Sequence, residues 1–238
     1  MPITVEIVDI EADQSDLDGV FDYFDSVDQR FSTYKKDSEI SRVNRGLTES
    51  KWSDEMKEVL ELCQQTKNET DGFFDIRHEK QRDPSGLVKG WAIQNAAELL
   101  ERQGFQNYYV DAGGDIQTKG VNTKDQPWQV GLRNPFNRDE VIKVLAVSGE
   151  AVATSGLYIR GPHIYNPHDP KDELAAVASL TVVGPSIFDV DRFATAAYAM
   201  GPQGISFIEA RPDLEAYSVG QNGLATMTSG FERYVNHA

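Results

Sequence analysis

Asp191 and Thr195 carry hard oxygen atoms and lie four residues apart in the segment VDRFATAAYAMG, residues 190–201. Small and apolar residues fill the rest of this segment, which predicts a helix over 189–200 that ends at Gly201. Residues four apart share one face of a helix. Mg²⁺ prefers oxygen ligands and often takes one or two from the protein and others from substrate phosphates. The spacing is therefore compatible with a magnesium site.

The same two residues also have a simpler structural interpretation. An aspartate near a helix start can cap the helix and interact favourably with its dipole. A threonine inside a helix can donate to a backbone carbonyl of the preceding turn. Spacing alone favours this structural interpretation of Asp191 and Thr195, so the choice depends on the rest of the sequence.

A glycine-rich segment, DAGGDIQTKG at 111–120, follows a predicted strand at 106–111. The Gly113–Gly114 pair is most simply a tight turn. Alternatively, the missing Cβ atoms would let a flat ring or a phosphate approach the backbone. The chain has neither a Walker A loop nor a GxGxxG motif, so no familiar nucleotide signature decides between the two.

The histidines and the cysteine form no recognisable reactive group. None of the four histidines has zinc-type spacing to another histidine or to the single cysteine, Cys63. His163, in GLYIRGPHIYNP, is a lone histidine, and such residues are more often structural than catalytic. Ser155 lies outside a GxSxG pattern, so a serine hydrolase is not indicated.

Both helices and strands must position these residues. Apolar residues three or four apart predict helices over 16–31 and 89–103, and Ser53 can cap a helix that ends near Asp71. A short helix is predicted at about 202–209, and strands at 3–10, 106–111, 127–132, 141–147, 151–154, 175–183, 214–218 and 224–228. Strands follow strands in the middle and at the end of the chain. The pattern predicts an α+β fold with mixed or antiparallel sheets, as a single domain over 1–238.

The composition narrows the classes of molecule that the protein could bind. The chain has 238 residues, of which 39% are hydrophobic, enough for a core. Lys+Arg 23 against Asp+Glu 38 gives a net charge of −15, which argues against a nucleic-acid partner and requires a cation beside any phosphate ligand. No apolar run is long enough to span a membrane, and the N-terminus has no signal-peptide layout, so we expect a cytoplasmic protein.

Taken together, six segments resemble the ApbE family of FAD:protein FMN transferases, also called flavin transferases. Each segment alone is unspecific, but their combination and order are specific, and the similarity extends from about residue 3 to residue 201. The segments are FSTYKKDSEISRVN (31–44), DGFFD (71–75), DPSGLVKGWAIQ (83–94), DAGGDI (111–116), ATSGLYIRGPHIYNP (153–167) and DVDRFATAAYAMG (189–201).

The resemblance implies a T-fold-type α+β domain that takes FAD as substrate together with Mg²⁺. Such enzymes cleave the FAD pyrophosphate, attach FMN through a phosphoester to a Thr or Ser of an acceptor protein, and release AMP. Some relatives instead hydrolyse FAD to FMN and AMP. The resemblance also implies that Asp191 and Thr195 are magnesium ligands and that the backbone carbonyl of Gly86 completes the protein ligands.

Further roles follow from the same resemblance. Lys89 is expected to steady phosphate oxygens. A base must take the proton of the acceptor hydroxyl; His163 has a suitable ordinary pKa, and Asp115 is the alternative. Contacts to the flavin nucleotide are expected from Tyr34, Glu39, Gly113, Gly114, Asp115, Ser155, Gly156, His163 and Ile164.

The chain departs from the family pattern in three places. The Met-Gly-Thr element before the first strand is absent or reduced to Met1, only seven residues (76–82) separate DGFFD from DPSG, and NPHDPKDE replaces the usual Asp-Pro and Thr-Gly. These departures affect flavin contacts and acceptor recognition more than the metal site. Three alternatives to flavin transfer therefore stay open: an FAD pyrophosphatase, a non-catalytic flavin-binding protein, and a degenerate relative that serves as an interaction module.

Overall fold

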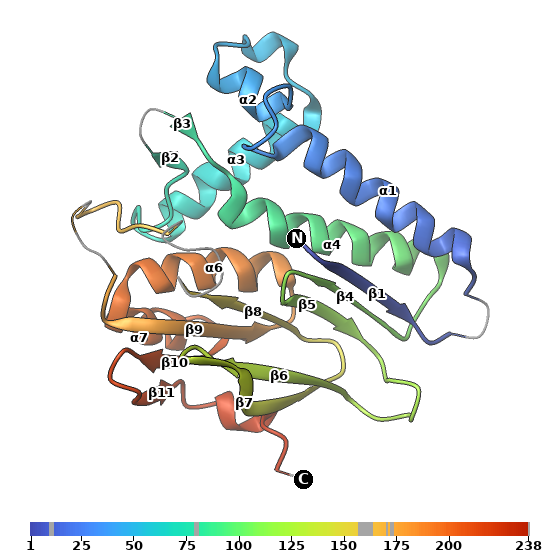
Figure 1. The fold of residues 1–238 in the computed structure, drawn as a ribbon, viewed down its shortest axis with the longest axis vertical. Helices are drawn as coiled ribbons and strands as arrows, with labels where there is room; N and C mark the ends of the chain where they lie inside the picture. Colours follow the sequence, from blue (N-terminus) through green and yellow to red (C-terminus); the bar gives the residue numbers. More distant parts are fainter. Residues whose placement is uncertain (10–11, 79–80, 157–163, 170, 172–173, 238) are drawn as a thin grey trace.

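Helices cover one face of a seven-stranded sheet, and a β-hairpin covers part of the other face (Figure 1). The structure is a computed structural model that describes residues 1–9, 12–78, 81–156, 164–169, 171 and 174–237. Within these residues, no helix combines the length and the apolar character needed to cross a bilayer.

The main sheet is antiparallel throughout its paired strands. Its spatial order is β1-β4-β5-β8-β9-β10-β11. The bounds are β1 Ile3–Ile7, β4 Tyr108–Ala112, β5 Asp115–Lys119, β8 Ala151–Ser155, β9 Val177–Gly184, β10 Glu215–Gly220 and β11 Ala225–Met227. The remaining strands form two hairpins, β2 Arg77–His78 with β3 Gln81–Arg82 and β6 Trp128–Asn134 with β7 Asn137–Val147. The predicted α+β fold with antiparallel sheets is confirmed.

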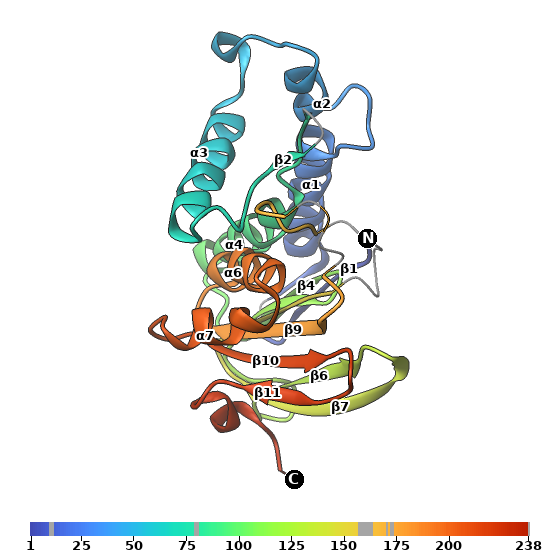
Figure 2. The ribbon, with the colours of Figure 1, turned by 90° about the vertical axis from the view of Figure 1, so that its left-hand side faces the viewer.

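Three helices lie directly against the sheet, and one of them, Gly204–Glu209, packs on the strand Glu215–Gly220. The helices are α1 Gln14–Phe31, α2 Glu39–Asn44, α3 Asp54–Glu69, α4 Ser85–Gln103, α6 Ile187–Ala199 and α7 Gly204–Glu209, with 3₁₀ turns at Glu49–Lys51, Gly201–Gln203 and Phe231–Tyr234. α4 packs on β4 and β5, and α6 packs on β8 and β9. α1 and α3 pack on α4 and form an outer layer (Figure 2).

Local signals explain most helix ends. Ser53 caps α3 as predicted, because its hydroxyl accepts from the Met56 N–H. Gly104 ends α4 in the left-handed conformation, at φ 100°. The predicted start of α4 at residue 89 is too late, since the helix begins at Ser85 after the N-cap Pro84. The carboxylate of Asp83 accepts from the Ser85 N–H and satisfies this first turn.

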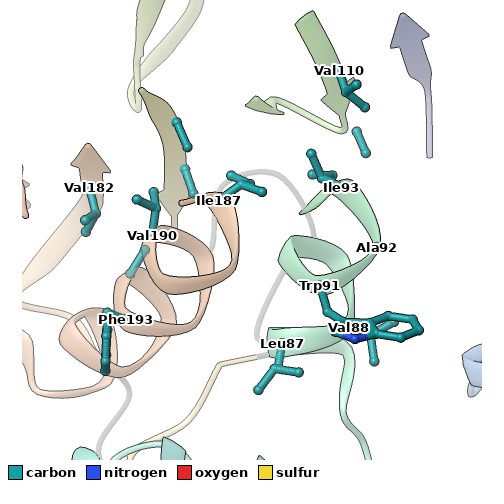
Figure 3. Close-up of a cluster of buried hydrophobic side chains, with 14 of the residues drawn as sticks. Leu87, Val88, Trp91, Ala92, Ile93, Val110, Val182, Ile187, Val190 and Phe193 are labelled. Carbon is teal, nitrogen blue, oxygen red and sulfur yellow. The ribbon is translucent and has the colours of Figure 1, made fainter. Parts of the chain in front are cut away.

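Apolar side chains form one core on each face of the sheet. The larger core lies between the sheet and the helices, and Figure 3 shows part of it, with side chains of α4 and α6 beside strand residues such as Val110 and Val182. The smaller core lies between the sheet and the β6–β7 hairpin and includes Trp128, Leu145 and Phe231. α4 and α6 therefore have a fixed place on the sheet.

Among the helices and strands, α2, β2, β3 and β5 were not predicted, and all four have largely polar sequences. α2 is a helix of six residues in the segment EISRVN. β5 has the sequence DIQTK, and its Asp115, Gln117 and Thr118 are buried although polar. The turn between β4 and β5 is Gly113–Gly114, with φ of 69° and 95°, so the tight-turn interpretation of this pair is confirmed.

α4 and α6 approach each other most closely at Gly90. The Gly90 N–H donates to Asp191 Oδ2 at 2.7 Å. A Cβ atom at position 90 would lie 2.7 Å from Asp191 Cβ and 2.8 Å from the backbone oxygen of Ile187. One of these neighbours is backbone and cannot rotate away, so only glycine allows this distance between the helices.

We predict that Gly90→Ala lowers the free energy of unfolding by about 1–3 kcal/mol, the range typical of overpacked cores. The control is Gly19→Ala in α1, where an added Cβ meets nothing within 4 Å. It should be neutral or stabilise the protein by up to about 1 kcal/mol, since alanine is the better helix former. Urea unfolding followed by circular dichroism measures both. Equal stabilities for the two variants would contradict the close contact of α4 and α6.

Candidate functional site

A cavity of about 400 Å³ opens where α4, α6 and the sheet meet. Its walls are the first turns of α4, one face of α6, the β4–β5 turn, the end of β8, and residues from 73–78, 81–83 and 164–165. Eight residues singled out in the sequence line it: Gly86, Lys89, Gly113, Ser155, Gly156, Ile164, Asp191 and Thr195. Residues that are far apart in the chain are thus brought to one place.

Asp191 does not cap its helix. α6 begins at Ile187, with Ser186 as the N-cap residue, so Asp191 lies in the second turn. Its side chain is buried and accepts the N–H of Gly90 in the neighbouring helix. The capping interpretation is therefore wrong, because the helix starts four residues before Asp191.

Thr195 contacts α4 instead of the preceding turn of its own helix. Its hydroxyl donates to the carbonyl oxygen of Gly86 at 3.3 Å. A Cβ on Gly86 would lie 3.1 Å from Thr195 Cγ2, so glycine permits this approach. Asp191, Thr195 and Gly86 all line the cavity, and their carboxylate, hydroxyl and carbonyl groups are the hard oxygen donors that Mg²⁺ prefers. No group of three or more His, Cys, Asp or Glu with metal-site geometry occurs among the described residues.

Lys89 lies between two buried carboxylates. It forms an ion pair with Asp115, and its Nζ lies 3.4 Å from Asp191 Oδ1. Burial is the largest influence on Asp191 and raises the pKa of its carboxyl; the Lys89 ammonium lowers that pKa, and the Asp115 carboxylate raises it. The result is a pKa of about 7, against an ordinary value of 3.8.

Asp115 faces the helices from β5. Its Oδ1 accepts from the Thr154 N–H of β8 at 3.1 Å, and its Oδ2 is the partner of Lys89. The neighbouring Gly113 reaches the cavity, whereas Gly114 is exposed and donates its N–H to Asp111. The β4–β5 turn thus contributes one of its two glycines to the cavity wall.

Tyr34 and Glu39 lie outside the lining of the cavity. Tyr34 is 97% exposed. Glu39 is buried at the start of α2, where it accepts from the N–H of Ser53 at 2.6 Å and from its hydroxyl at 2.8 Å. Arg30 forms an ion pair with the same carboxylate. In this structure Glu39 therefore joins α1, α2 and the start of α3. His163 lies outside the described residues.

The sequence analysis did not assign a role to several lining residues. Phe73, Phe74 and Asp75 belong to DGFFD, Asp83 and Ser85 to DPSG, and Thr154 to ATSG. These segments carry the family resemblance, so the signal was present, but no spacing rule indicated which of their residues face a cavity.

Contacts near the cavity connect the surroundings of two atypical segments of the chain. Residues 76–82 include β2 and β3, and Tyr165 lies between the His-Ile pair and the atypical segment NPHDPKDE at 166–173. The Tyr165 hydroxyl donates to the carbonyl oxygen of Asp75 at 2.6 Å, and its ring lies 4.4 Å from that of His78. His168 Nε2 lies 2.9 Å from the carbonyl oxygen of Asp71. Tyr165 and His168 thus connect this part of the chain to residues 71–78.

Helices on one face of an antiparallel sheet, with an oxygen-rich cavity between α4 and α6, agree with a flavin transferase fold. The ApbE family model matches residues 1–83 and 77–218. Because these matches span most of its length, the chain belongs to the ApbE family. The resemblance seen in the sequence is confirmed.

Individual relatives agree with this assignment. A FAD:protein FMN transferase of Escherichia coli is 24% identical over 262 residues, covering 84% of this chain and 75% of that protein. One of Haemophilus influenzae is 26% identical, covering 85% and 78%.

Solved structures share the fold. The flavin transferase ApbE of Vibrio cholerae superposes with a TM-score of 0.84 at 22% identity, over 98% of this chain and 95% of that one. The flavinyl transferase ApbE of Pseudomonas stutzeri also gives 0.84, at 21% identity, over 99% and 94%.

The raised pKa of Asp191 predicts a pH dependence of stability in the metal-free protein. Between pH 3.8 and about pH 7 the Asp191 carboxyl is protonated in the folded state and ionised in the unfolded state. The stability that this protonation contributes is therefore lost as pH rises through that window. We expect the free energy of unfolding of the wild type, relative to Asp191→Asn, to fall from pH 4 to pH 7 and to level off above it. Denaturant unfolding in EDTA measures the difference. A difference that stays constant or rises with pH would contradict the assigned pKa.

Glu39 predicts a loss of stability on substitution. Glu39→Ala leaves Ser53 and Arg30 without their buried partner and should lower the free energy of unfolding by about 1–3 kcal/mol. The control Glu61→Ala, at an exposed position of α3, should stay within about 0.5 kcal/mol of the wild type. Thermal unfolding compares the two. A fully stable Glu39→Ala that binds FAD weakly would favour the nucleotide contact implied by the resemblance.

Proposed function

We propose that residues 1–238 form one Mg²⁺-dependent FAD:protein FMN transferase domain. The observation that carries this proposal is the convergence of the Asp191 carboxylate, the Thr195 hydroxyl and the Gly86 carbonyl on one cavity beside Lys89. Membership of the ApbE family supports the same reaction. The relatives named above are FAD:protein FMN transferases, and we extend that activity to this chain.

The residues present fit a magnesium ion. Asp191, Thr195 and Gly86 are all oxygen donors, and the Thr195 hydroxyl already lies 3.3 Å from the Gly86 oxygen. We propose that these three hold the ion. When bound, Mg²⁺ supplies charge neutralisation of the phosphates and polarises the phosphorus under attack. In a chain with a net charge of −15, such a cation would reduce the repulsion that opposes the binding of a pyrophosphate.

The other lining residues would bind and orient the nucleotide. The Lys89 ammonium would attract the phosphate oxygens. Gly113 and Gly156 carry no side chain, which lets a phosphate or a ring approach the backbone, and Ser155 and Ile164 complete this wall. Tyr34, Glu39 and Gly114 lie outside the cavity lining, so contacts from them require FAD to extend beyond it.

The transfer step needs a base for the acceptor hydroxyl. The hydroxyl oxygen of an acceptor Thr or Ser forms a bond to the FMN phosphorus, the bond from that phosphorus to the AMP phosphate oxygen breaks, and AMP leaves with the electron pair. The hydroxyl proton passes to the base. Both carboxylate oxygens of Asp115 are engaged, by Thr154 and Lys89, so we assign Asp115 to holding Lys89 and assign the base role to His163.

Asp191→Asn should lower the rate of AMP release from FAD by about 100-fold or more, because it removes the charged ligand of the Mg²⁺ ion that would neutralise the phosphates. The matched control is Asp189→Asn in the same helix, whose carboxylate pairs with Arg192 and does not line the cavity. It should retain the wild-type rate. The reaction is measured by chromatography of AMP and by mass spectrometry of an acceptor domain that carries a flavinylation-type threonine.

The products separate transfer from its alternatives. AMP release matched by the mass gain of FMN on the acceptor supports the transferase. AMP with free FMN, with and without acceptor, would instead indicate an FAD pyrophosphatase. FAD that stays bound and intact in the presence of Mg²⁺ would indicate a non-catalytic flavin-binding protein. A chain with no affinity for FAD would be an interaction module. Full activity of Asp191→Asn would contradict the proposed site.

A further inference from the structure

Lys89 connects the two most buried carboxylates of the cavity region. Its ammonium pairs with Asp115 and lies 3.4 Å from Asp191 Oδ1. The side chains of Asp115 and Asp191 are only 3% and 4% exposed, and that of Lys89 is 15% exposed. Carboxylates removed from water to this degree require a positive charge close by. Lys89 provides that charge in the protein without a bound metal.

The net charge of this group changes sign when a divalent cation binds. Two carboxylates and one ammonium carry one net negative charge, so the group repels a pyrophosphate. Adding two positive charges makes the net charge +1, and the group then attracts one. The same ammonium repels a divalent cation that approaches Asp191, because both positive charges compete for one carboxylate. Lys89 therefore opposes cation binding and favours phosphate binding.

We propose that Lys89 is an internal counter-ion of Asp191 which a divalent cation must displace, and that the displaced ammonium, held by Asp115, becomes available to the phosphates of the nucleotide. This inference rests on the proposed function and adds the regulation of its site. Cation and nucleotide bind cooperatively, since each relieves the unfavourable charge that opposes the other. In the cation-free protein the single ammonium offsets only one of the two carboxylate charges, so FAD binds weakly.

The structure provides a matched control for the charge of Lys89. Lys119 of β5 pairs with Glu101 of α4 at 3.0 Å, so it joins the same two elements as the Lys89–Asp115 pair. It does not line the cavity, and its side chain is 31% exposed. Lys119→Met removes one positive charge from the same α4–β5 contact without touching Asp191.

The first experiment measures Mg²⁺ binding to the full chain by calorimetry, without nucleotide, at pH 8, where protons compete least for the carboxylates. Lys89→Met should bind Mg²⁺ at least about tenfold more tightly than the wild type, since a repelling charge is removed. Lys119→Met should stay within about twofold, because its charge is distant and partly screened. Lys89→Arg keeps the charge and should resemble the wild type. Should Lys89→Met not fold, Lys89→Gln replaces it.

The second experiment measures FAD affinity in EDTA by flavin fluorescence. Lys89→Met should bind FAD about tenfold more weakly than the wild type, and Lys119→Met should not. Mg²⁺ affinity of Lys89→Met that equals or falls below that of the wild type would overturn the proposal. If the wild type nevertheless binds Mg²⁺ and splits FAD, the proposed function is retained and only the role of Lys89 as a counter-ion is rejected. If the wild type neither binds Mg²⁺ nor splits FAD, the proposed function fails, and this proposal fails with it.

Discussion

The candidate site depends on the contact between α4 and α6 at Gly90. There the backbone N–H of one helix donates to the Asp191 carboxylate of the other at 2.7 Å, and an added Cβ would meet backbone at 2.8 Å. The same approach brings the Gly86 carbonyl within 3.3 Å of the Thr195 hydroxyl, one turn earlier in α4 and one turn later in α6. The larger core fixes both helices on the sheet, so the oxygen donors are held by packing and do not rely on loops. Any residue that separates the helices changes all of these distances together.

Charge is the second constraint on the site. The chain carries a net charge of −15, yet its proposed substrate is a pyrophosphate. Two nearly buried carboxylates face the helix contact and would destabilise the fold without compensation. Lys89 and the Gly90 N–H of α4, together with the Thr154 N–H of β8, provide that compensation. The arrangement stabilises the cation-free protein and at the same time prepares a carboxylate, a hydroxyl and a carbonyl for a hard metal ion.

The features predicted correctly from the sequence are those that local residue preferences determine. The caps at Ser53 and Gly104 and the Gly113–Gly114 turn follow from the conformations of these residues. β5 was not predicted because its buried residues are polar and pair with elements distant in sequence. Whether Asp191 caps its helix or faces another depends on Gly90, 101 residues away, and no local pattern contains that contact. The family resemblance supplied the grouping of Asp191, Thr195 and Gly86, which the structure then places on one cavity. It did not indicate that Glu39 holds the start of α3.

The most direct measurement is a crystal structure of the chain grown with Mn²⁺ in place of Mg²⁺, with anomalous scattering used to locate the ion. The account predicts one strong anomalous peak within coordinating distance of the Asp191 carboxylate, the Thr195 hydroxyl and the Gly86 carbonyl oxygen, with the Lys89 ammonium moved away from Asp191 and still beside Asp115. Mn²⁺ bound elsewhere on the chain, with Lys89 still 3.4 Å from Asp191, would contradict it.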